Sequence, residues 1–266
     1  MAITTEDHLV DMVANARPYS YLKVLTAPKA AGAFQSAWMA AGRPGAGVAS
    51  PVYTAGSGYT CSSATTGALA QANGSVQNWL ARATATAGVV GTLLVYDRLW
   101  SCSGMGFAAS TYAVTTPSTL PARITDSGVG VEAWIENFVA AGAASGTATL
   151  TYVNTVPTSA RTGVIAAVVS APVAGQMQPF PLQAGDVGIS QVTNVITSAT
   201  WTSGSFGVTL MKKIAEIPVG LAGVSQLFDW SDVVTKIPAD ACIQLVWQAN
   251  STTAPTVNGT LWVGDK

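Results

Sequence analysis

From residue 78 onward, the chain is a succession of short runs rich in valine, isoleucine, threonine, tyrosine and tryptophan, separated by turn residues. β-Branched and aromatic residues fit the pleated, half-buried surface of a sheet. Long helical patterns are missing between the runs, which disfavours a parallel α/β arrangement. The pattern predicts an all-β fold, a β-sandwich or jelly-roll-like body. The predicted strands are Trp79–Ala87, Thr92–Trp100, Val131–Ala140, Thr147–Val153, Gly163–Val169, Val187–Thr197, Phe206–Ile217, Cys242–Ala249 and Gly259–Val263.

One of these runs, Val131–Ala140, also fits a helical period. The glycine at position 142 and the β-branched residues after Gly146 favour a strand that forms a hairpin with the next run.

Residues 1–75 differ from the rest and predict an N-terminal arm. Thr4 followed by Glu6 and Asp7 is typical of a helix start, with Thr4 as the N-cap. A second short helix is predicted over Gly32–Ala41, followed by flexible, glycine-rich sequence. We therefore expect a short helical arm with long loops over 1–75 and a β body over 76–266, or one domain overall.

The charge content limits the functions open to this chain. Charged residues make up 9% of it against about 25% in ordinary soluble domains, and the formal net charge is −1. A protein that binds nucleic acid needs a basic face, so no nucleic-acid partner is predicted. A net charge near zero promotes association, which suits a subunit of an assembly. The uncharged stretch 162–185 contains three prolines, so no membrane partner is predicted.

Residues suited to catalysis are scarce. His8 is the only histidine, so neither a Ser-His-Asp triad nor a histidine metal site is indicated. Glu132 and Glu136 would lie on one face of a strand about 13 Å apart, beyond the carboxylate spacing of glycosidases. We predict no enzyme activity, no cofactor and no metal. Cys61, Cys102 and Cys242 are expected to be buried or free thiols, or to form one internal or inter-subunit bridge.

Two local groups of residues combine charge with aromatic side chains. Within Tyr96–Trp100, Asp97 and Arg98 favour a structural ion pair over a docking site. Around Trp230, Asp229 and Asp232 form a candidate glycan site, with an Asx turn as the alternative.

Several stretches give the chain a resemblance to a known family. They are Leu80–Arg82, Gly91–Trp100, Pro172–Met177, Pro181–Asp186, Phe206–Leu210, Ile214–Pro218 and, in the N-terminal part, Phe34–Gly47. Together they resemble a family of tailed-bacteriophage virion structural proteins. The resemblance implies a cement or decoration protein, made in the host cytoplasm, that binds the major capsid protein on the outer surface of the head. It also implies self-association, with a homotrimer expected.

Two other functions remain as alternatives. A tail or fibre protein would bind host carbohydrate, and an envelope hydrolase would use carboxylates. For the decoration protein, lattice contact is expected through aromatic and apolar residues of the arm, unless the arm folds back onto the body. The expected interface residues are Tyr19, Tyr21, Leu22, Phe34 and Trp38.

Overall fold

The computed structural model describes residues 5–49, 58–69, 78–106, 110–114, 120–156, 160–229, 231 and 235–265. This part is nearly all β, with one short helix, α1 (Glu6–Ala14). The strands are β1 (Arg17–Val24), β2 (Phe34–Ser36), β3 (Ala41–Arg43), β4 (Tyr59–Thr60), β5 (Asn78–Ala87), β6 (Gly91–Ser101), β7 (Met105–Gly106), β8 (Ser110–Ala113), β9 (Val131–Val139), β10 (Ala148–Asn154), β11 (Arg161–Ile165), β12 (Gln176–Pro179), β13 (Ile189–Thr197), β14 (Ser205–Val219), β15 (Gln226–Phe228), β16 (Thr235–Ile237), β17 (Ile243–Ala249) and β18 (Thr256–Asp265).

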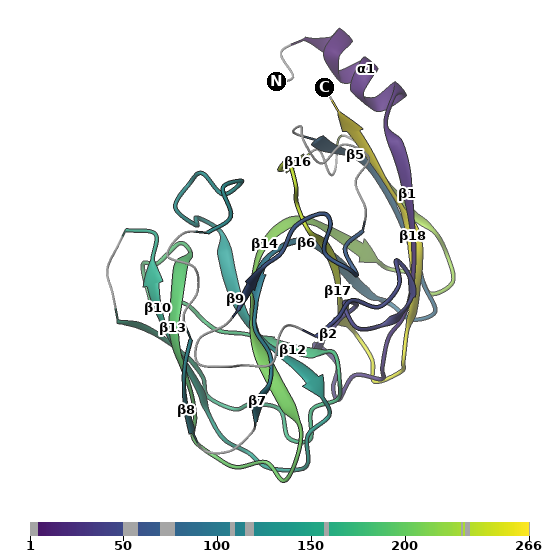
Figure 1. The fold of residues 1–266 in the computed structure, drawn as a ribbon. Helices are drawn as coiled ribbons and strands as arrows, with labels where there is room; N and C mark the ends of the chain where they lie inside the picture. Colours follow the sequence, from purple (N-terminus) through teal and green to yellow (C-terminus); the bar gives the residue numbers. More distant parts are fainter. Residues whose placement is uncertain are drawn as a thin grey trace.

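The centre of the molecule is a closed ring of six antiparallel strands, which we call the barrel (Figure 1). Its hydrogen-bonded order is β6-β17-β2-β12-β9-β14, and β14 pairs again with β6. β4 and β7 extend the same sheet. Closure satisfies the backbone groups at what would otherwise be sheet edges.

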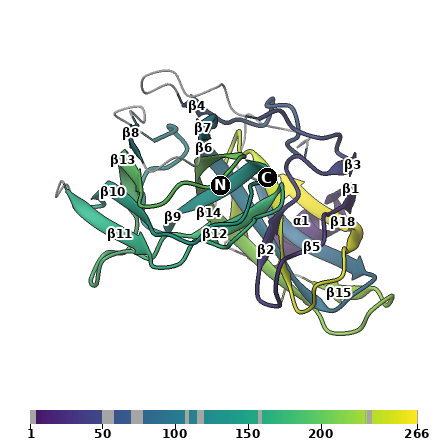
Figure 2. The ribbon, with the colours of Figure 1, turned by 90° about the horizontal axis from the view of Figure 1, so that it is seen from below.

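Two further sheets flank the barrel on different sides (Figures 1 and 2). One runs β15-β5-β18-β1-β3, with β16 also on β5, and the other runs β11-β10-β13-β8. Alternation along the barrel strands sends one set of side chains inward and the other outward. The outward set forms two cores: Leu93 and Val95 pack with Leu261 of the first sheet, and Ile135 packs with Leu150 of the second. The all-β, sandwich-like prediction is confirmed.

The predicted first helix is confirmed as α1, with its cap one residue later than expected. Thr5 is the N-cap, and its hydroxyl accepts a hydrogen bond from the His8 amide. Thr4 lies outside the described residues. Met12 packs against Trp79 on β5, which fixes the helix at one end of the first sheet. No described helix has the length and apolar character needed to span a bilayer.

The second predicted helix, over 32–41, is wrong. Phe34–Ser36 forms β2, which pairs with β17 and β12 inside the barrel, and Ala41–Arg43 forms β3 beside β1. Nonlocal pairing overrides the helical spacing of Phe34 and Trp38 here. Residues 17–43 thus share sheets with strands of the predicted body.

Each of the nine predicted strands overlaps an observed one, but the predicted hairpin is wrong. β9 pairs with β12 and β14 in the barrel, whereas β10 pairs with β11 and β13 in a different sheet. The sequence pattern indicates strand character, and it carries no information about which strand becomes the neighbour.

A loop carboxylate, Asp186, holds the four-stranded sheet together. Its two oxygens accept from Arg161 at 2.9 Å, from Asn154 at 2.8 Å and from Tyr152 at 2.6 Å. The hydrogen bonds from Arg161 first, then those from Asn154 and Tyr152, hold the pKa of Asp186 far below its usual range.

We expect Asp186→Asn to lower the melting temperature at neutral pH. A carboxylate with a lowered folded-state pKa stabilises the fold above its unfolded pKa of about 3.9 and loses that effect as the pH falls further. The difference between wild type and variant should therefore shrink below about pH 4. Thermal denaturation followed by circular dichroism from about pH 2 to about pH 7 measures it. A difference that stays constant with pH would contradict this account.

Candidate functional site

The inside of the barrel contains a buried ion pair. Arg98 Nη1 on β6 lies 2.8 Å from Glu136 Oε2 on β9, and the two side chains are 0% and 1% exposed. Burial alone would lower the pKa of Arg98, but the Glu136 carboxylate outweighs it and raises that pKa. Both side chains are buried and out of reach of a substrate.

Neighbouring side chains add further hydrogen bonds to this pair. Arg98 also lies 4.5 Å from the centre of the Trp38 ring, a cation–π distance. Gln244 and Ser101 accept from Arg98, while Ser36 and Thr209 donate to Glu136, all at 2.6–2.7 Å. A buried hydrogen-bond network of this size supports the fold.

At the end of the barrel away from this pair, a cavity of about 310 Å³ opens to solvent. We call it the barrel mouth. Barrel mouths are among the common positions of ligand sites. The Trp134 ring stands edge-on to Phe34 and to Tyr96, with centroids 4.9 and 5.9 Å away. The residues that line the barrel mouth are Phe34, Leu94, Tyr96, Glu132, Trp134, Pro179, Phe180, Leu182, Lys213, Glu216 and Gln248.

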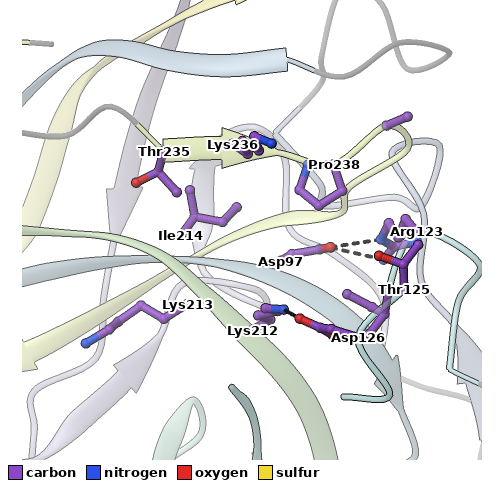
Figure 3. A pocket seen from close by; sticks show the side chains of 12 residues that line it. Asp97, Arg123, Thr125, Asp126, Lys212, Lys213, Ile214, Thr235, Lys236 and Pro238 are labelled. Carbon is purple, nitrogen blue, oxygen red and sulfur yellow. Dashed lines mark hydrogen bonds and ion pairs between the residues drawn. The ribbon is translucent and has the colours of Figure 1, made fainter. Parts of the chain in front are cut away.

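A second cavity, of about 500 Å³, lies on the outside of the barrel between β14, β16 and residues 123–126 (Figure 3). Arg123 holds Asp97 with two hydrogen bonds, at 2.8 and 3.0 Å. Lys212 is hydrogen-bonded to Asp126 (Figure 3). These charges on the wall already have partners within the chain, so this outer cavity is the weaker candidate for binding.

The ion pair predicted between Asp97 and Arg98 is wrong in its partners. The two residues are neighbours on β6, so their side chains point to opposite faces. Asp97 faces outward to Arg123, whereas Arg98 faces into the barrel to Glu136. Burial raises the pKa of Asp97 despite the opposing hydrogen bond from Arg123. Both charges serve the structure.

The expected interface residues lie in very different places. Tyr21 and Trp38 are 2% and 1% exposed, buried within this chain. Tyr19 is half-buried on β1, and Phe34 is half-buried at the barrel mouth. Leu22 is 42% exposed. Of the five, Leu22 has the highest fractional exposure, whereas Tyr21 and Trp38 pack within the chain.

The structure describes only part of the expected glycan site. Asp229 accepts hydrogen bonds from the amide and hydroxyl of Ser231, at 2.9 and 2.6 Å, as in an Asx turn. Trp230 and Asp232 lie outside the described residues.

The residues considered for catalysis do not converge. His8 lies on α1, a helix that Figure 1 shows away from the barrel. Glu132 and Glu136 share the inward face of β9 as expected, but the Glu136 carboxylate already has Arg98 as its partner. Among the residues the structure describes, no three His, Cys, Asp or Glu side chains cluster as metal ligands would.

The three cysteines are buried thiols in the structure. Cys61 and Cys242 lie together beside Trp38, and a hydrogen bond from Cys242 chiefly lowers the pKa of Cys61. Burial raises the pKa of Cys102 to about 12. Since thiolates are the reactive species, Cys102 should react more slowly than Cys61.

We expect the folded protein to react slowly with a maleimide and the unfolded, unreduced protein to take up three equivalents. At limiting reagent, Cys61 should be modified before Cys102, which mass spectrometry of peptides resolves. A Cys102→Ser variant, which should take up two equivalents, is the control. One equivalent in the unreduced wild type would reveal a disulfide instead.

Comparison with known proteins gives little further direction. No protein-family model matches the chain, and no curated protein matches its sequence. Among solved structures, the VP2 subviral particle of infectious bursal disease virus is 9% identical, covering 95% of this chain and 80% of that one at a TM-score of 0.22. Its T=1 particles are 9% identical, with coverages of 94% and 78% and a TM-score of 0.21. Scores this low do not indicate a shared fold.

Proposed function

We propose that this chain is a non-enzymatic structural protein of a virion, and that it acts as a cement or decoration protein on the major capsid protein of a tailed-phage head. The observation that carries the proposal is the solvent side of the six-stranded sheet, which we call the outer sheet face. It presents exposed Leu22, Val24 and Leu227. Threonine and serine hydroxyls fill the space between them: Ser20, Thr84, Thr86, Thr256 and Thr260.

A sheet face with this composition fits a covered surface. Soluble monomers protect their sheets with charges of both signs, whereas the charged residues that the alternation places on this face are Arg43 on β3, Arg82 on β5 and Lys236 on β16, all of one sign. Covering such a face on a lattice adds buried area at several neighbours at once, which multiplies weak contacts. A homotrimer is the expected unit, with a mass three times the 27.1 kDa of the chain.

Binding to particles tests the proposal. Leu22→Glu places a charge on the outer sheet face and should lower occupancy on capsids lacking this protein by roughly tenfold or more. Val164→Glu is the matched control, because Val164 on β11 is 44% exposed against 42% for Leu22. Electron microscopy and gel quantification of washed particles give the occupancy. Equal occupancy of both variants would refute the role of this face, and density only on the tail would favour a host-binding protein.

A further inference from the structure

The barrel mouth contains a carboxylate that is positioned from within. Glu132 on β9 accepts a hydrogen bond from the Tyr96 hydroxyl at 3.1 Å and one from Trp134 Nε1 at 3.0 Å, both on Oε2. Burial and then the nearby Glu132 charge raise the pKa of Tyr96, which keeps its hydroxyl protonated as a donor. Two fixed aromatic donors thus hold the carboxylate in one orientation before any ligand arrives.

Glu132 differs from the neighbouring carboxylates in its partners. The other partly buried or buried carboxylates of the barrel and its flank, Glu136, Asp97 and Asp186, each have an arginine. Among the ion pairs of the described residues, none includes Glu132. The nearest cation of the lining, Lys213, pairs with Glu216 at 3.1 Å on the exposed rim. Carboxylates in partly dry surroundings ordinarily have a partner, so Glu132 is set to receive one.

The walls around this carboxylate suit a flat cation on an aliphatic stem. The edge-on arrangement of Phe34 and Tyr96 about Trp134 builds an aromatic floor. Pro179 and Leu182 add apolar surface at the opening. Aromatic surfaces attract guanidinium groups, and the second carboxylate oxygen, Oε1, accepts neither of the two aromatic hydrogen bonds and can accept a charged N–H donor. A volume of about 310 Å³ accommodates such a group together with its methylene stem.

We propose that the barrel mouth binds an alkylguanidinium group, with Glu132 as its counter-ion. A protein source would be an arginine side chain of a second copy of this chain, and a free source would be a small guanidinium compound. The site needs no capsid, so it stands or falls separately from the structural role proposed above. It also differs from the outer cavity, whose arginine and lysines already have partners within the chain.

Titration of the isolated full chain with butylguanidinium tests the proposal. Calorimetry should give a dissociation constant on the order of 1 mM, as expected for a ligand of this size. In NMR spectra, the indole N–H signal that disappears in Trp134→Phe should shift during the titration, because it donates to Glu132. Butylurea, which keeps the shape and lacks the charge, should bind at least about tenfold more weakly.

Variants separate the proposed site from general charge effects. Glu132→Gln keeps the size and can still accept from Tyr96 and Trp134, and it should weaken binding roughly tenfold. Asp126→Asn removes a carboxylate outside the mouth and should leave binding unchanged. Equal binding of butylurea, unchanged affinity in Glu132→Gln with a native circular dichroism spectrum, or no binding by wild type would each overturn the proposal.

Light scattering in the same titration identifies the source of the group. If oligomers of the chain dissociate as butylguanidinium is added, an arginine of a second copy occupies the mouth. If the mass stays unchanged while the ligand binds, a free guanidinium compound is the source. Both outcomes support the site and assign its natural ligand.

Discussion

Glu136→Ala is expected to destabilise the protein by about 3–5 kcal/mol. The substitution leaves the Arg98 guanidinium 0% exposed inside the barrel without its counter-ion. It also removes the acceptor for Ser36 and Thr209, which donate to Glu136 at 2.6 Å. Urea unfolding followed by tryptophan fluorescence measures the free energy of unfolding, and the unfolding slope shows whether the transition remains two-state.

The matched control removes both charges. A double variant with Arg98→Met and Glu136→Leu should recover most of the loss, because apolar residues of similar volume often replace a buried pair at little cost. Arg98→Met alone should be nearly as harmful as Glu136→Ala. If either single variant cost less than about 1 kcal/mol, the pair would not be the support of the barrel described here.

Tyr21→Ala is expected to cost about 3–5 kcal/mol, although Tyr21 belongs to the segment that the sequence predicts as an arm. Its ring is 2% exposed between the first sheet and the barrel, and its hydroxyl donates to the Thr84 carbonyl at 2.8 Å. The variant loses the buried area of the ring and leaves that carbonyl without this donor. The same unfolding assay measures the effect.

The neighbouring residue supplies the control for this prediction. Leu22 points to the opposite face of β1 and is 42% exposed, so Leu22→Ser should change stability by no more than about 0.5 kcal/mol. A small effect of Tyr21→Ala, or equal effects of the two substitutions, would mean that β1 is not integrated into the sheet.

Strand content could be predicted from the sequence because it is encoded locally. The runs that became β10 and β13 are rich in β-branched and aromatic residues along their length. β2 could not be predicted, since three residues carry no period and its conformation follows from pairing with β17 and β12. β1 was missed because Arg17–Pro18 indicates a helix end, while its partner β18 lies at the other end of the chain.

The candidate sites show the same division between local and distant information. Alternation alone places Glu132 and Glu136 on one face of a strand, as the structure has them. Their different roles could not be predicted, because Arg98 comes from another strand and pairs with only one of them. Nothing in the sequence indicated that Arg123 would pair with Asp97, since Asp97 lies 26 residues earlier in another element.

The pairing of β1 with β18 also determines when the six-stranded sheet can form during translation. Ser20 and Thr260 meet across that pair, 240 residues apart. At about 5–20 residues per second, a ribosome needs tens of seconds to supply the second strand after the first has emerged. The nascent chain therefore holds β1 and β5 without their shared partner β18 during that time, and the six-stranded sheet can form only after β18 has been made.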